Sequence, residues 1–173
     1  MDKIMFNDKY GLTDAVLGRQ KTMTRRKSAL YMTGQIVAIA QDYKTILESE
    51  YLPSALETEV CRLVRSKHRG TTNKMFVKGE YMPHHIRILS CKFQHLQDIT
   101  NEECLKEGIM PYYDGPNGDD GLHQIVGYTF VGGHLYIYDS AKEAFASLIN
   151  KLNGKGYWES NPRVFAYEFE LIN

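Results

Sequence analysis

The sequence predicts an α+β protein in which a mostly antiparallel, barrel-like sheet is accompanied by several short helices. Two patterns lead to this class. Apolar and polar residues alternate in several short segments, as they do in strands with one buried face. Three Ser or Thr residues stand three positions before a Glu, which is the capping-box pattern that opens a helix. With 173 residues, the chain is long enough for one domain with a substantial core.

The helices are predicted from capping signals and from the spacing of apolar residues. The first covers about residues 10–17 and ends at Gly18. Three further helices open at capping boxes, formed by Ser54 with Glu57, Thr100 with Glu103, and Ser140 with Glu143. Gly108 and Gly154 are expected to end the last two of them, since glycine accepts the left-handed conformation that follows a helix.

The strands are predicted from short apolar or alternating runs between turn residues. They cover residues 36–40, 74–82, 84–96 and 163–172. A hairpin is expected over residues 123–139, with Gly132 and Gly133 as its turn. Together with the helices, these strands give the α+β order described above.

The overall composition indicates a protein without a global charge bias. Lys plus Arg and Asp plus Glu both number 21, so a nucleic-acid surface has to be a local patch. The three cysteines are widely spaced and odd in number, which favours reduced thiols in a cytoplasmic protein. No apolar run approaches the roughly 20 residues of a membrane span, and we expect no membrane partner.

No metal or cofactor motif stands out. His84 and His85 are adjacent, but neighbours on a strand point to opposite faces and are poorly arranged to share a metal ion. The string around Lys155 lacks the first glycine and the trailing Ser or Thr of a phosphate-binding loop. We therefore expect no metal and no cofactor.

The densest chemistry lies in "GRQKTMTRR", residues 18–26, where four cationic side chains surround Thr22 and Thr24. A Lys/Arg cluster on a loop is most often a solvated face. Alternatively, a desolvated Lys21 among other cations has a lowered pKa and can take the proton of a nearby threonine hydroxyl. Both interpretations remain open from the residues alone.

This segment resembles the signature of the ASCH family, small domains with a PUA-like β-barrel related to RNA-binding modules. In that signature a Lys is followed by a polar residue three positions on and by an Arg two further on; here these are Lys21, Thr24 and Arg26. The family's Gly two positions before the Lys is Arg19 in this chain, and Gly18 stands one residue earlier. The chain also resembles longer ASCH-like proteins of phage and bacterial genomes in its "LQDIT" and "GKGYWESNPRVFAYEFEL" phrases.

Within the family, "KTMTRR" is similar to the Lys-Thr-x-Thr-x-Arg string of the bacterial acetylcytidine amidohydrolases. The resemblance implies that Lys21 is the proton acceptor, Thr24 the nucleophile, and Glu107, seven residues after Thr100, the proton donor. Thr24 then attacks the acyl carbon, Glu107 protonates the departing amine, and water releases the acyl-enzyme. The plain alternative for Glu107 is an exposed carboxylate in the last turn of a helix.

The resemblance further implies one ASCH domain over residues 1–173, with insertions near 48–72 and 112–139. Candidate contacts to a substrate or nucleic acid are Thr22, Arg25, Arg26, Lys78 and Trp158. The cations either line a basic cleft or are scattered and solvated. The tryptophan either anchors its loop in the core or stacks on a base.

Three classes of function follow. The first is recognition of RNA or of a nucleoside in a basic cleft. The second is an enzyme that hydrolyses the amide of an N-acylated cytidine. The third is a protein-interaction module of mobile-element origin, in which the charged cluster forms only salt bridges.

Overall fold

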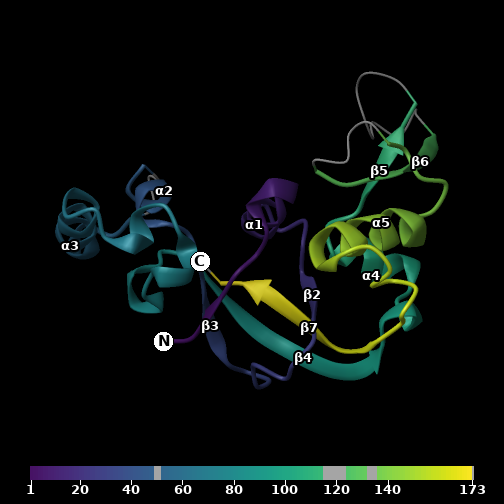
Figure 1. Cartoon of the computed structure of the whole chain (residues 1–173), viewed down its shortest axis with the longest axis horizontal. Helices are drawn as coiled ribbons and strands as arrows, with labels where there is room; N and C mark the ends of the chain where they lie inside the picture. The colour runs from purple at the N-terminus through teal and green to yellow at the C-terminus, as the bar shows by residue number, and fades with distance from the viewer. Residues whose placement is uncertain (49–51, 115–123, 132–135, 173) are drawn as a thin grey trace. The chain divides into compact units, whose positions relative to one another are not determined.

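The computed structural model describes residues 1–48, 52–114, 124–131 and 136–172 (Figure 1). The chain divides into two compact units, each built from segments that are distant in sequence. Unit 1 consists of Met1–Phe6, Tyr31–Leu89 and Phe169–Asn173, and unit 2 of Asn7–Leu30 and Ser90–Glu168. Each unit is described by itself below.

The main sheet has five strands in the order β1-β3-β4-β7-β2. The strands are β1 (Lys3–Ile4), β2 (Met23–Arg26), β3 (Ile36–Ile39), β4 (His85–His95) and β7 (Arg163–Leu171). β1 runs parallel to β3, whereas β3 with β4 and β2 with β7 are antiparallel. A second sheet pairs β5 (Met110–Tyr113) with β6 (Ile125–Thr129). The sheet is therefore mixed, and the α+β class is confirmed.

The predicted barrel is wrong. In the described ranges the five-stranded sheet is open, with β1 and β2 as its edges. The segments that were expected to extend the sheet go elsewhere: residues 74–82 form 3-10 turns at Lys74–Phe76 and Gly79–Tyr81, and β6 pairs with β5 in the separate sheet. β1 has only two residues. Among the described residues, the two edge strands β1 and β2 are not paired with each other, as a closed barrel would require.

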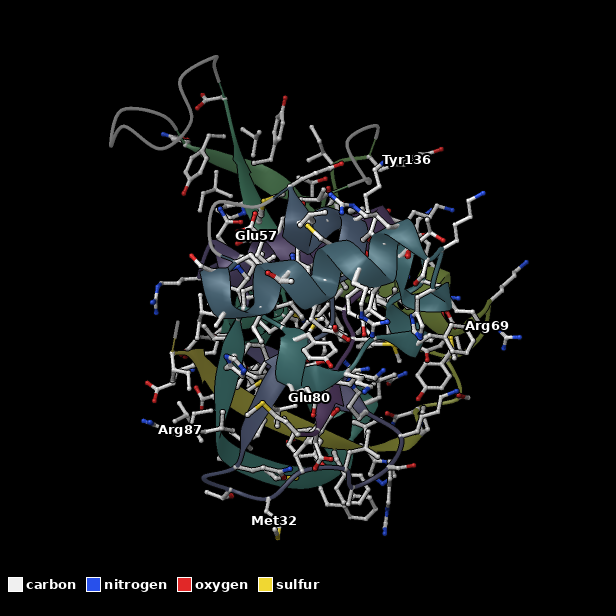
Figure 2. All side chains as sticks on the ribbon, turned by 90° about the vertical axis from the view of Figure 1, so that its left-hand side faces the viewer. Met32, Glu57, Arg69, Glu80, Arg87 and Tyr136 are labelled. Carbon is white, nitrogen blue, oxygen red and sulfur yellow. The ribbon has the colours of Figure 1, made fainter. Side chains whose placement is uncertain are left out.

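In unit 1, two helices pack over one apolar cluster. The helices are α2 (Tyr43–Leu47) and α3 (Ser54–Arg65). The cluster includes Tyr43, Ile46 and Val60, all fully buried, and draws in β3 through Ala38. The opposite side of α3 carries charged residues such as Glu57, whose position Figure 2 shows. An amphipathic helix of this kind is held by its apolar face.

The capping box predicted at Ser54 is wrong. The helix already begins at Ser54, so Pro53 occupies the cap position and no side chain caps it. The two other boxes fare better. The full reciprocal box of Thr100 with Glu103 is present at α4 (Asn101–Lys106), and Ser140 accepts from the Glu143 amide at α5 (Ala141–Asn153). No helix in the described residues is long and apolar enough to cross a membrane.

The predicted hairpin is present in part. Tyr128 and Tyr138 form an antiparallel bridge, which is the pairing expected of its two arms. The turn at Gly132 and Gly133 lies outside the described residues. The pairing of β6 with β5 was not predicted, because Met110–Tyr113 carries a proline and shows no clear alternation.

The segment that leaves α1 (Leu12–Leu17) turns sharply at Arg19. Gly18 follows the helix as predicted, but it is Arg19 that adopts the left-handed conformation, with φ of 59°. The Arg19 amide donates to the Val16 carbonyl and the Lys21 amide to that of Ala15, which closes the turn. A side chain at this φ is strained, and only glycine adopts it freely.

This turn predicts an unusual order of stability between two variants. Arg19→Gly should be more stable than Arg19→Ala by about 1 kcal/mol, because alanine keeps the left-handed strain that glycine removes. Urea unfolding measures the difference. At Arg65, exposed at the end of α3, the same two substitutions should give the reverse order, since alanine is the better helix former. Equal stability of the two Arg19 variants would contradict the assignment of strain.

Candidate functional site

Lys21 is fixed by main-chain bonds to two helices of unit 2. Its own amide donates to the Ala15 carbonyl of α1 at 2.9 Å, and the next amide, that of Thr22, donates to the Lys106 carbonyl of α4 at 2.9 Å. The Lys21 residue is only 3% exposed. Its amine is therefore brought to the C-terminal end of α4 by backbone contacts and held away from solvent.

The ammonium group of Lys21 is bonded twice to Glu107. Its Nζ donates to the carboxylate Oε2 at 2.6 Å and to the main-chain carbonyl at 2.8 Å. Glu107 is 5% exposed and follows the last residue of α4. A cation near the C-terminal carbonyls of a helix also interacts favourably with the negative end of the helix dipole. The predicted base and acid thus lie in direct contact.

Arg25 of β2 completes a four-residue cluster. Its Nη1 donates to Glu107 Oε1 at 2.9 Å, and its Nη2 donates to Glu103 Oε2 at 2.7 Å. The guanidinium carbon lies 5.8 Å from the ring centre of Phe145 in α5. Each carboxylate oxygen of Glu107 therefore receives one cation. We call Lys21, Arg25, Glu103 and Glu107 the buried charge cluster.

Two cations and two carboxylates balance within the buried charge cluster. The Arg25 side chain is 1% exposed and the Glu107 side chain 6%, whereas Glu103 retains 16% and is the most exposed member. One donor is left over: the Nε of Arg25 is buried and has no hydrogen-bond partner among the described residues. A buried donor without an acceptor is costly, so an acceptor that reached this nitrogen would gain a hydrogen bond.

Burial changes the acid–base properties of this region. Desolvation lowers the pKa of Lys21 below its usual value; the attraction of Glu107 opposes the shift, and Arg26 and Arg25 add to it. Desolvation likewise raises the pKa of the neighbouring Cys104 thiol to about 12. The Lys21 amine therefore gives up its proton more readily than an exposed lysine, while the cysteine stays a neutral thiol.

Thr24 does not join the buried charge cluster in the described contacts. It lies in β2 next to Arg25, and successive side chains of a strand point to opposite faces. Its register partner on β7 is Tyr167, and both residues are buried. The hydroxyl thus belongs to the strand face opposite the Arg25 guanidinium.

The remaining predicted contacts lie in different places. Arg26 shares the strand face of Thr24 and is half-buried. Lys78 belongs to unit 1, where its Nζ lies 3.8 Å from Glu80 and over the ring of Tyr81. Trp158 is half-buried in unit 2 and meets Phe145 edge-on at 6.1 Å, which fits a hydrophobic anchor.

Glu103 was not predicted as part of a site, only as a helix cap. Its Oε2 does both: it accepts from the Thr100 amide at 3.2 Å and from Arg25 Nη2 at 2.7 Å. The signal was present in the sequence, because residues 103 and 107 are four apart and share one face of a helix. What the sequence did not indicate is which cation they would face.

Among the described residues, no group of three or more His, Cys, Asp or Glu side chains is arranged to hold a metal ion. No family model, no curated protein and no solved structure matches this chain. The site is therefore interpreted from its own geometry.

The buried charge cluster predicts strong coupling between its members. Lys21→Met or Glu107→Gln alone should lower the free energy of unfolding by about 3–5 kcal/mol, because each leaves a buried charge without its partner. The double variant should lose less than the sum of the two, as urea unfolding of all four proteins will show.

The matched control is the exposed pair of Arg87 and Glu170 in unit 1, whose side chains are 48% and 45% exposed. Figure 2 shows Arg87 directed away from the ribbon. Arg87→Met and Glu170→Gln should each change stability by less than about 1 kcal/mol. Additive effects of Lys21→Met and Glu107→Gln would contradict the coupling.

Proposed function

We propose that this chain is an ASCH-like domain that binds a nucleoside, free or within RNA, at the buried charge cluster. The observation that carries the proposal is the unpaired Nε donor of Arg25, buried among carboxylates and a second cation. A cytosine edge offers an amino donor beside ring acceptors. The carboxylate of Glu103 can accept a hydrogen bond from the amino group, and the Nε of Arg25 can donate one to a ring acceptor.

The turn at Arg19 supports the ASCH resemblance. The family signature has glycine at this position, two before the lysine, and the backbone here has the left-handed φ of 59° that favours glycine. The chain thus keeps the glycine-type turn while carrying an arginine. Lys21, which follows this turn, reaches Glu107 as the resemblance implies for the base and the acid.

A binding experiment tests the nucleoside proposal. Titration calorimetry with cytidine, N4-acetylcytidine, uridine and adenosine should detect binding with a preference for one of the cytosine nucleosides. Arg25→Lys keeps the positive charge but removes the Nε donor, and should weaken binding about tenfold or more. Arg87→Lys changes an exposed arginine that is distant from Arg25 in the sequence, and it should leave nucleoside binding unaltered.

Far-UV circular dichroism establishes that the Arg25→Lys protein is folded before it is titrated. If the wild-type protein binds none of the four nucleosides, or if folded Arg25→Lys binds as tightly as wild type, the nucleoside proposal fails.

Hydrolysis of an N-acylated cytidine is a second candidate, favoured by the 2.6 Å contact between Lys21 and Glu107. The lowered pKa of Lys21 makes its neutral amine accessible as a base. In this reaction Lys21 takes the proton of the attacking hydroxyl, a C–O bond forms at the acyl carbon, and the C–N bond breaks as Glu107 protonates the leaving nitrogen. The hydroxyl comes from water, which gives the free acid directly, or from Thr24 on the other face of β2, in which case water then hydrolyses the acyl-enzyme and frees the threonine.

Chromatographic detection of cytidine released from N4-acetylcytidine tests this candidate. Glu107→Gln should lower kcat by about 10²–10⁴, since it removes a proton donor, whereas Glu170→Gln should not. Thr24→Val and Thr24→Ser identify the nucleophile: loss with valine and retention with serine favours the threonine, and full activity in both favours water. Absence of turnover in the wild-type protein would leave only the binding proposal.

A further inference from the structure

A second, different surface lies on unit 2, on the strand face opposite the buried charge cluster. Phe93 of β4 and Phe165 of β7 lie side by side, with ring centres 4.7 Å apart and planes tilted by 34°. The guanidinium carbon of Arg163 lies 5.7 Å from the centre of the Phe93 ring. Arg163 and Phe165 are two apart on β7, so both side chains leave the same face of the strand.

A second arginine extends this row across the sheet. Arg26 of β2 is the register partner of Phe165, and directly opposed residues of an antiparallel pair share a face. Its neighbour Arg25 points to the other face, toward α4 and α5. The row therefore runs Arg26, Phe165, Phe93, Arg163, with two aromatic rings between two guanidinium groups. We call it the aromatic–arginine row.

The aromatic–arginine row is open where its aromatic rings meet. Phe93 is 57% exposed, Arg163 is exposed, and Phe165 is half-buried. From Cys91 to Phe93, β4 is exposed at every residue, although it is a strand of the main sheet. Figure 1 shows β4 and β7 running along each other, as their order in the sheet requires. An exposed phenylalanine stacked beside a half-buried one, with an arginine over its ring, offers an apolar surface that a partner could cover.

We propose that the aromatic–arginine row binds single-stranded nucleic acid. Unpaired bases stack on the rings of Phe93 and Phe165, and the guanidinium groups of Arg163 and Arg26 contact the phosphates on either side. Aromatic rings on a sheet surface interleaved with cations are the arrangement that holds unstacked bases without reading their sequence. This surface is separate from the nucleoside site and does not depend on it.

Charge favours this occupant over an apolar partner. In the described part of the chain, the Arg163 guanidinium lies over the Phe93 ring and no carboxylate neutralises it. An arginine held over an aromatic ring stays charged, is weakly hydrated and can pass to a phosphate oxygen. A duplex is a poor fit, because its bases are stacked on one another and do not offer a face to the rings.

Fluorescence anisotropy with a labelled short oligouridylate, and with the matching oligothymidylate, tests the proposal at low and physiological salt. Phe93→Ala should weaken binding about fivefold to 150-fold, which is the range for loss of one stacked base. Phe93→Trp should retain binding. Arg163→Ala should weaken it and reduce the salt slope by about 1.

Matched controls come from the same strand. Leu89→Ala removes an exposed apolar side chain of β4 that is 43% exposed, and Arg87→Ala removes an exposed cation; both should bind as wild type. Phe93→Ala should bind nucleosides as the wild-type protein does, which separates this proposal from the nucleoside site.

The proposal is supported whether RNA and DNA bind equally or one is preferred, and a preference shows which of the two nucleic acids this surface favours. It is overturned if neither oligonucleotide binds at low salt, if Phe93→Ala binds as tightly as wild type, or if a blunt duplex of the same length competes equally well.

Discussion

The contact between the Lys21 ammonium and the Glu107 carboxylate is the constraint on which the candidate site in unit 2 depends. It joins the segment after α1 to the end of α4, two regions that are 86 residues apart in sequence. A buried ion pair is weak evidence for stability by itself, because desolvation offsets most of the attraction. This pair differs from a simple ion pair in its neighbours. Arg25 binds the other carboxylate oxygen of Glu107 and also binds Glu103, and among the described residues its Nε donor has no acceptor.

Charge balance explains how a cation-rich string can be buried. The opening residues of the segment suggested a basic surface, yet Lys21 and Arg25 face Glu107 and Glu103 inside the protein. Such a site favours a ligand with both donors and acceptors and little net charge, since an anion would meet two carboxylates. Arg26, the next residue of β2, lies instead on the other face of the strand. β2 thus presents one arginine to each of its two faces.

Local signals in the sequence predicted local structure well. The capping box at Thr100, the glycine that follows α4 and the position of the last strand all depend on neighbouring residues, and the structure contains them. Lys21 and Glu107, both named as site residues from the sequence, lie in direct contact, and their chemical roles stay a prediction. Strand pairing was harder: the segment at residues 74–82 has strand-like residues but forms 3-10 turns, and β6 pairs with β5 outside the main sheet. Pairing partners are decided by distant contacts that periodicity does not encode. The partners of Glu103 and the ring pair of Phe93 with Phe165 were missed for the same reason.

One carboxylate oxygen of Glu103 accepts two hydrogen bonds, one from the Thr100 amide of the capping box and one from the guanidinium of Arg25. Whatever draws that oxygen toward an incoming molecule also withdraws it from the Thr100 amide, and the opening turn of α4 then loosens. If the proposed nucleoside binds at the buried charge cluster, faster exchange of the Thr100 amide hydrogen would report the fraying of this helix end.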